Sequence, residues 1–90
     1  MTQKVQIMPD VLSQEVSGET VLLDLNHENY FGLNEVGTRI WQLLQSENNL
    51  ETIYEKLLDE YEVDAEVLSQ EFDNIIKELL SSNIIERADV

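Results

Sequence analysis

The chain has 90 residues, of which 19 are Asp or Glu and only 5 are Lys or Arg, so its formal net charge is −14. This acidity argues against nucleic-acid binding, because few cations are available to neutralise phosphates. The absence of cysteine excludes disulfide bonds and thiol chemistry, and no run approaches the roughly 18 apolar residues that a membrane helix requires.

The first third of the chain has the residue pattern of short β-strands. Apolar side chains recur at alternate positions, and clusters of Ser, Gly and Asn separate the runs. Gly18 tolerates the positive φ of a two-residue hairpin turn. In chain order we expect a short edge segment at Val5–Ile7, a strand at Val11–Val16, a turn at 17–18, a strand at 19–26, an Asn-rich turn at 26–29 and an aromatic strand at Tyr30–Leu33.

The remaining residues have helical periodicity. Each of three predicted helices follows a residue suited to the N-cap position, where the side chain accepts a hydrogen bond from the first turn. These residues are Asn34, Asn49 and Asp64. Asn83 is predicted to adopt a left-handed conformation after the third helix. The chain then turns back through Ile84 and Ile85, and residues 87–90 are expected to fray.

Three strands followed by three helices predict an α+β domain of the winged helix-turn-helix kind, in which helices cover one face of a small antiparallel sheet. The third helix of such a fold commonly reads DNA. Here it would carry four acids and one lysine: Glu66, Glu71, Asp73, Glu78 and Lys77. We therefore expect a partner other than DNA. The start of the chain lacks the apolar run of a signal peptide, which predicts a single cytoplasmic domain over residues 1–90.

Residues 24–35 have the ligand spacing of a calcium-binding EF-hand loop. The ligand positions would be Asp24, Asn26, Glu28 and Glu35. Two observations oppose this interpretation. Asn29 stands where the loop needs glycine, and the preceding residues have the pattern of a strand rather than of an entering helix. Calcium binding therefore stays the weakest of the alternatives.

Catalysis has little support in the sequence. The single histidine, His27, lies in a polar turn, and nothing in the sequence places a nucleophile or a metal ligand beside it. An acyl carrier protein would need a serine in an Asp-Ser-Leu motif at a helix start, and the sequence has no such motif. We expect no enzymatic activity, no cofactor and no metal.

The third predicted strand, Tyr30–Leu33, is expected at a sheet edge. Its unpaired backbone groups would accept an extended peptide as an additional strand. Gly32 would let another backbone approach closely, or would only relieve crowding at a bulge. Tyr30 and Phe31 alternate across the sheet, so one ring would face the core and the other would line a groove, unless both rings only pack.

The stretch LLDLNHENYFGLNEVGTRIWQLL, residues 22–44, resembles the PqqD-like family, the recognition elements of ribosomally made, post-translationally modified peptides. The shared pattern is an apolar strand, a turn, an aromatic pair and then L-N-x-x-G-x-x-I-W. Here these positions are Leu33, Asn34, Gly37, Ile40 and Trp41. The likeness covers about residues 10–86. In its length the chain is most similar to the stand-alone leader-binding proteins of lasso-peptide pathways.

The resemblance implies that the leader segment of a precursor peptide adds as a strand beside the third strand, in a groove walled by the third helix. The implied binding residues are Asn29, Tyr30, Phe31, Gly32, Leu33, Val67, Leu68, Glu71, Phe72, Asn74, Ile75 and Ile76. Which side of the helix faces the groove stays open. Glu71, Asp73 and Glu78 would attract basic leader residues, or would only form a solvated helix face.

In the lasso version of the family, the leader brings a tyrosine and a proline into apolar pockets. The protein presents the precursor to a separate leader peptidase, and a cyclase acts afterwards. The resemblance thus implies a non-catalytic binding protein without nucleic-acid or membrane partners, either a monomer or a weak homodimer through the strand edge. The alternative is a winged-helix protein–protein interaction or regulatory module that does not bind DNA.

Overall fold

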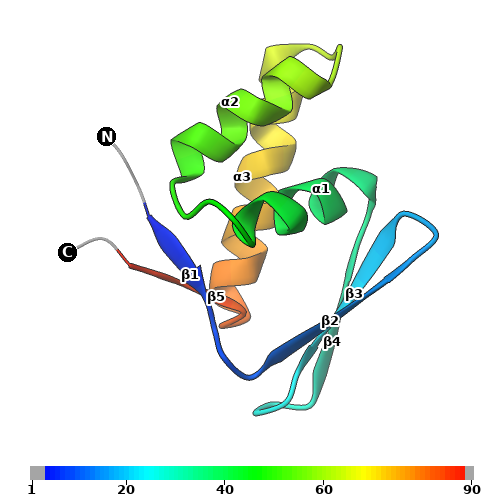
Figure 1. Ribbon diagram of the computed structural model, residues 1–90, viewed down its shortest axis with the longest axis vertical. Helices are drawn as coiled ribbons and strands as arrows, with labels where there is room; N and C mark the ends of the chain where they lie inside the picture. Colours follow the sequence, from blue (N-terminus) through cyan, green and yellow to red (C-terminus); the bar gives the residue numbers. More distant parts are fainter. Residues whose placement is uncertain (1–3, 89–90) are drawn as a thin grey trace.

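A computed structural model describes residues 4–88, which form a three-stranded sheet, a two-stranded sheet and three helices (Figure 1). The predicted α+β class is confirmed. In chain order the elements are β1 (Val5–Ile7), β2 (Val11–Val16), β3 (Glu19–Asp24), β4 (Asn29–Leu33), α1 (Glu35–Leu44), α2 (Leu50–Glu60), α3 (Ala65–Ser81) and β5 (Ile85–Arg87). The helices lie together beside the larger sheet, and β1 and β5 lie at the opposite side from β4 (Figure 1).

Strands β2, β3 and β4 form the expected antiparallel meander, in the order β2-β3-β4. In the first hairpin turn Ser17 and Gly18 have φ of 52° and 82°. Positive φ at both central residues is the geometry that matches the twist of the flanking strands. The second turn contains Glu28, whose φ is 53°.

The larger sheet has one buried and one exposed face. Along β3 the buried residues are Thr20, Leu22 and Asp24, and the residues between them are exposed or half-buried. Directly paired residues share a face, so Phe31 and Leu33 of β4 lie on the same inner face. The opposite, outer face carries residues from all three strands: Leu12, Gln14, Val16, Glu19, Val21, Leu23, Tyr30 and Gly32.

The expectations for the two ends of the chain were partly wrong. Strand β1 does pair at an edge, but its partner is β5, in a separate two-stranded sheet. Arg87, which was expected to fray, pairs with Val5, and the N–H of Ala88 donates to the C=O of Lys4 at 2.8 Å. This pairing helps to bury Val5, which is 1% exposed. Residues 89–90 of the segment expected to fray lie outside the described residues.

The three helices begin where their capping residues predict. The side chains of Asn34, Asn49 and Asp64 each accept a hydrogen bond from a first-turn N–H, at 2.9, 3.2 and 2.8 Å respectively. Asn83 has the predicted left-handed conformation, with φ of 59°. Local capping chemistry therefore fixes the helix ends, as it does in isolated helices.

One core joins the sheet to the helices. Its fully buried side chains come from both sheets and all three helices: Val5, Leu22, Ile40, Ile53, Leu57, Leu68, Leu79, Ile84 and Ile85. On the surface, the guanidinium of Arg39 on α1 donates two 2.7 Å hydrogen bonds to the carboxylate of Glu60 on α2. These bonds lower the pKa of Glu60. Within residues 4–88, no helix has the length and apolar character needed to cross a membrane.

Candidate functional site

Strand β4 offers a free backbone edge. Within residues 4–88 it pairs with β3 on one side and with no strand on the other. The sheet's other edge strand, β2, has five of its six residues exposed, whereas β4 runs along a hollow beside α3. Unpaired N–H and C=O groups on such an edge can be satisfied by an added extended chain.

The hollow beside β4 has a volume of about 310 Å³. Its lining combines the end of β4, the cap of α1 and one face of α3: Phe31, Gly32, Leu33, Asn34, Glu71, Asn74, Ile75 and Glu78. Leu33 is buried, and Phe31 and Ile75 are half-buried, so apolar side chains form the floor. Carboxylates and amides form the rim. We call this hollow the β4–α3 groove.

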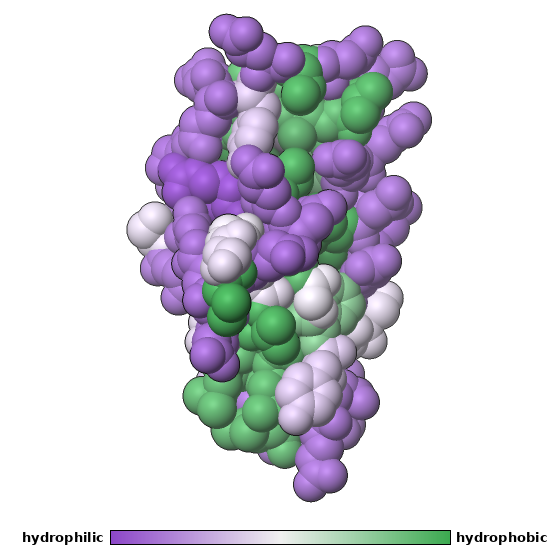
Figure 2. Space-filling model, turned by 90° about the vertical axis from the view of Figure 1, so that its right-hand side faces the viewer, coloured by the Kyte–Doolittle hydropathy of each residue, from purple (hydrophilic) through white to green (hydrophobic). Residues whose placement is uncertain are grey.

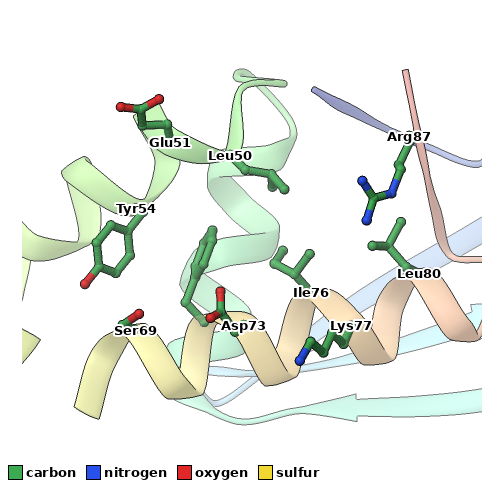
Figure 3. Close-up of a pocket in the computed structure, with 10 residues that line it drawn as sticks. Leu50, Glu51, Tyr54, Ser69, Asp73, Ile76, Lys77, Leu80 and Arg87 are labelled. Atoms are coloured by element: carbon green, nitrogen blue, oxygen red, sulfur yellow. The ribbon is translucent and has the colours of Figure 1, made fainter. Parts of the chain in front are cut away.

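Helix α3 lines two hollows with opposite faces. Glu71, Asn74 and Glu78 face the β4–α3 groove, because residues three, four and seven apart share a helix face. The other face of α3 borders a second hollow, of about 480 Å³, between α2, α3 and β5. Figure 3 shows this second hollow, with Leu50 of α2 and Ile76 of α3 directed into it.

The binding residues that the family resemblance implied on α3 divide into residues that line the groove, one exposed residue beside them and residues buried in the core. Glu71, Asn74 and Ile75 line the β4–α3 groove. Val67 is 53% exposed and lies one turn before Glu71 on the same helix face. The other three residues are buried in the core: Leu68, Phe72 and Ile76. Asp73, considered as an attractor for basic residues, lines the second hollow instead.

The residues implied on β4 also divide into two groups. Phe31, Gly32 and Leu33 line the groove. Tyr30 does not, because it lies on the outer face of the sheet and is 77% exposed. Asn29 is exposed at the beginning of the strand. The alternation of Tyr30 and Phe31 therefore turns one aromatic ring towards the helices and the other away from them.

Two lining residues, Asn34 and Glu78, were absent from the implied binding set, although Glu78 was considered as an attractor for basic leader residues. The sequence did carry a signal for Glu78, which follows Glu71 by seven residues and thus by about two helical turns. Asn34 drew notice only as a helix cap. Its place at the junction of β4 and α1 brings the cap to the rim of the groove.

The start of α1 holds the end of β4 in position. The side chain of Asn34 accepts a 2.9 Å hydrogen bond from the N–H of Gly37. A Cβ added at Gly37 would lie 3.1 Å from Cβ and from Cδ2 of Leu33. Such a distance is tighter than ordinary packing, so glycine allows α1 to pass this close to the strand. The L-N-x-x-G spacing thus links the groove floor to the helix.

The turn between β3 and β4 is fixed by Asp24. Its carboxylate accepts hydrogen bonds from Nδ1 of His27 at 2.7 Å and from the N–H of Asn26 at 3.0 Å. The hydrogen bond from His27 is the main cause that lowers the pKa of Asp24 below its usual value of 3.8. His27 therefore has a structural contact that accounts for its position in the turn.

The substitution His27→Ala is expected to make stability less dependent on pH in the acid range. A carboxyl with a lowered pKa stabilises the fold above its usual pKa of 3.8, and this contribution is lost as pH falls through the lower, folded value. The variant should be less stable than the wild type at about pH 6, and the difference should shrink towards about pH 2. Urea denaturation at both pH values measures this, and an equal difference at the two values would contradict it.

The EF-hand interpretation of residues 24–35 is not supported. Residues 29–33 of that stretch form strand β4, so the chain is extended where a calcium loop would wrap around the ion. The carboxylate of Asp24 is engaged by its own turn. Over residues 4–88, no group of three or more His, Cys, Asp and Glu side chains is arranged to hold a metal ion.

The sequence matches the family model described as coenzyme PQQ synthesis protein D (PqqD) over residues 19–85. The chain belongs to the PqqD family. The resemblance to PqqD-like recognition elements is thus confirmed. The matched region contains strands β3 and β4 of the three-stranded sheet and all three helices. No curated protein matches the chain significantly.

Two solved structures share this PqqD fold. TbiB1 in complex with the TbiA(beta) leader peptide has a TM-score of 0.82 and 34% sequence identity, over 93% of this chain and 99% of that chain. Lasso peptide synthetase B1 complexed with the leader peptide has a TM-score of 0.74 and 22% identity, over 91% of this chain and 96% of that chain. The second likeness concerns the fold alone.

Proposed function

We propose that the protein is a non-catalytic binding protein that captures the leader segment of a ribosomally made precursor peptide as an added strand beside β4. The observation that carries this proposal is the free edge of β4 along the β4–α3 groove. Strand addition supplies main-chain hydrogen bonds, and the groove supplies side-chain selectivity. The similarity to a leader-bound relative at 34% identity supports the same assignment.

Side chains of a strand added beside β4 would point alternately into the groove and to the outer face of the sheet. Its side chains opposite Phe31 and Leu33 would point into the groove, because directly paired residues share a face of the sheet. The side chain opposite Gly32 would point to the outer face. A Cβ at Gly32 meets no atom within 4 Å, so this position leaves open space beside the incoming strand.

The proposal is tested by isothermal calorimetry with the leader segment of a precursor peptide identified among the neighbouring genes. We expect one peptide per chain with a Kd below about ten micromolar, an affinity of about 7 kcal/mol. Sedimentation without peptide is the control, because a tight dimer through β4 would occupy the same edge. Absence of binding at tens of micromolar leader would reject the proposed function.

The outer face of the sheet is the surface proposed to present the bound leader to the leader peptidase and, later, to the cyclase of the pathway. Its exposed apolar side chains are Leu12, Val16, Val21 and Tyr30, each at least 42% exposed. Figure 2 shows hydrophobic residues gathered in the lower half of this side of the molecule. An exposed apolar patch on a small acidic protein is typical of a protein-binding surface.

The substitution Val21→Lys is expected to impair presentation of the leader to the peptidase without impairing leader binding. Val21 lies at the centre of the outer face and is 42% exposed, so the fold and the groove should tolerate a lysine. Leader affinity should stay within about twofold of the wild type. Leader removal by the pathway's peptidase should slow at least tenfold, because a charge would be desolvated at the interface.

The matched control for this experiment is Gln70→Lys, which adds the same charge at an exposed position of α3. The control should support leader removal at the wild-type rate, measured by mass spectrometry of the cleaved precursor. Equal rates for both variants would place the peptidase contact elsewhere on the protein.

A further inference from the structure

Two carboxylates line the β4–α3 groove. Glu71 and Glu78 line it and are exposed, and its described lining contains no Lys or Arg. Within residues 4–88, neither carboxylate takes part in an ion pair with a Lys or Arg of the chain. An apolar floor with two uncompensated carboxylates favours a ligand that is apolar at its centre and basic on either side.

The spacing of the two carboxylates can be compared with the spacing of strand residues. Glu71 and Glu78 are seven residues apart, so their Cα atoms are separated by about 10.5 Å along the axis of α3. Ile75 lies between them on the same side of the groove. In an extended ligand, residues that point to the same face are about 6.7 Å apart. A central residue over Ile75 therefore has groove-facing neighbours about 13 Å from each other.

The difference between these two lengths is small enough for flexible side chains to absorb. Lys and Arg carry their charge at the end of three or four methylene groups, so each has to reach only one or two Å along the groove. The residues between the groove-facing positions point to the outer face and do not meet the carboxylates.

We propose that Glu71 and Glu78 make the groove selective for leader segments of the pattern basic–x–apolar–x–basic, with the apolar residue over Ile75. This inference rests on the proposed function, because it names the chemistry of the strand that the groove accepts. Each exposed carboxylate contributes about 1.5- to 5-fold in affinity, the range of surface ion pairs. The preference weakens as salt screens the charges.

The test uses three probe peptides, each nine residues long with blocked ends. All have leucine at the centre and threonine elsewhere, and they differ only two positions either side of the leucine, where they carry lysine, glutamine or glutamate. Amide chemical shifts of the ¹⁵N-labelled protein are followed during titration. We expect shifts in β4 and α3, with the lysine peptide binding about tenfold more tightly than the glutamate peptide.

A charge-reversed variant decides whether the two carboxylates are responsible. In Glu71→Lys/Glu78→Lys the order should invert, so that the glutamate peptide binds most tightly. The control is Glu55→Lys/Asp73→Lys, which changes net charge equally at exposed positions outside the groove, on α2 and on the opposite face of α3. This control should keep the wild-type order.

The outcomes separate the two proposals. If all three peptides shift β4 with equal affinity, strand capture stands and the charge selectivity is overturned. If the order changes as much in the control variant as in the charge-reversed variant, overall charge is responsible and the roles of Glu71 and Glu78 are overturned. If the cognate leader itself leaves β4 unshifted, the proposed function fails, and the inference fails with it.

Discussion

Replacing Asn74 by tryptophan is expected to weaken leader binding at least fivefold. Asn74 is exposed on α3 and lines the groove, so an indole there would fill much of a hollow of about 310 Å³. Entry of a strand would then require displacing the ring, and overfilled sites cost about 1–3 kcal/mol, equivalent to about 5- to 150-fold in affinity. Calorimetry with the leader segment measures the change.

The fold should tolerate this substitution. Asn and Trp have similar helix propensities, and surface changes usually alter stability by less than about 0.5 kcal/mol. Asn74→Ala, which leaves the groove open, and Ala65→Trp, which adds the same ring at an exposed site on the opposite side of α3, are the matched controls. Both should bind leader within about threefold of wild type. Wild-type affinity of Asn74→Trp would move the binding site away from the groove.

The substitution Leu22→Ala is expected to give the largest loss of stability. Leu22 is fully buried at the centre of the inner sheet face, opposite Ser13 on β2 and Phe31 on β4. Removing a buried leucine side chain costs about 2–5 kcal/mol. The free energy of unfolding of a native protein is about 5–15 kcal/mol in total. The variant should therefore lose a large part of its stability. Urea denaturation monitored through the single tryptophan, Trp41, measures it.

The neighbouring residue provides the control. Val21→Ala shortens a side chain on the same strand, but that side chain points to the outer face and is 42% exposed. It should cost less than about 1 kcal/mol. Similar losses for the two variants would mean that the sheet is not packed on the helices through the inner face. The apparent leader affinity of Leu22→Ala should fall with the folded fraction, because only folded molecules carry the edge of β4.

The sequence predicted the local structure well because its signals are local. Capping side chains such as Asn34 and Asp64 act on the next turn of the chain, and the positive φ at Gly18 depends on the residue itself. The pairing of β1 with β5 could not be predicted this way. Those strands have three residues each and lie about 80 positions apart in the sequence, so no periodicity connects them.

The candidate site was predictable to the level of elements, but only partly to the level of residues. Periodicity places Ile75 and Ile76 on one apolar stripe of α3, yet Ile75 lines the groove and Ile76 faces the second hollow. Adjacent residues on a helix diverge by about 100°. The position of α3 between the β4–α3 groove and α2 decides which of them lines the groove, and that position depends on the whole fold.

Strands β1 and β5 also bear on how this domain combines with others. They run antiparallel, with Ala88 bonded to Lys4, so the polypeptide enters and leaves the described fold side by side. In Figure 1 this pair lies across the molecule from β4. Adjacent ends make a domain tolerant of insertion or fusion. The same domain is therefore suited to insertion into a loop of a larger enzyme, with the free edge of β4 still accessible.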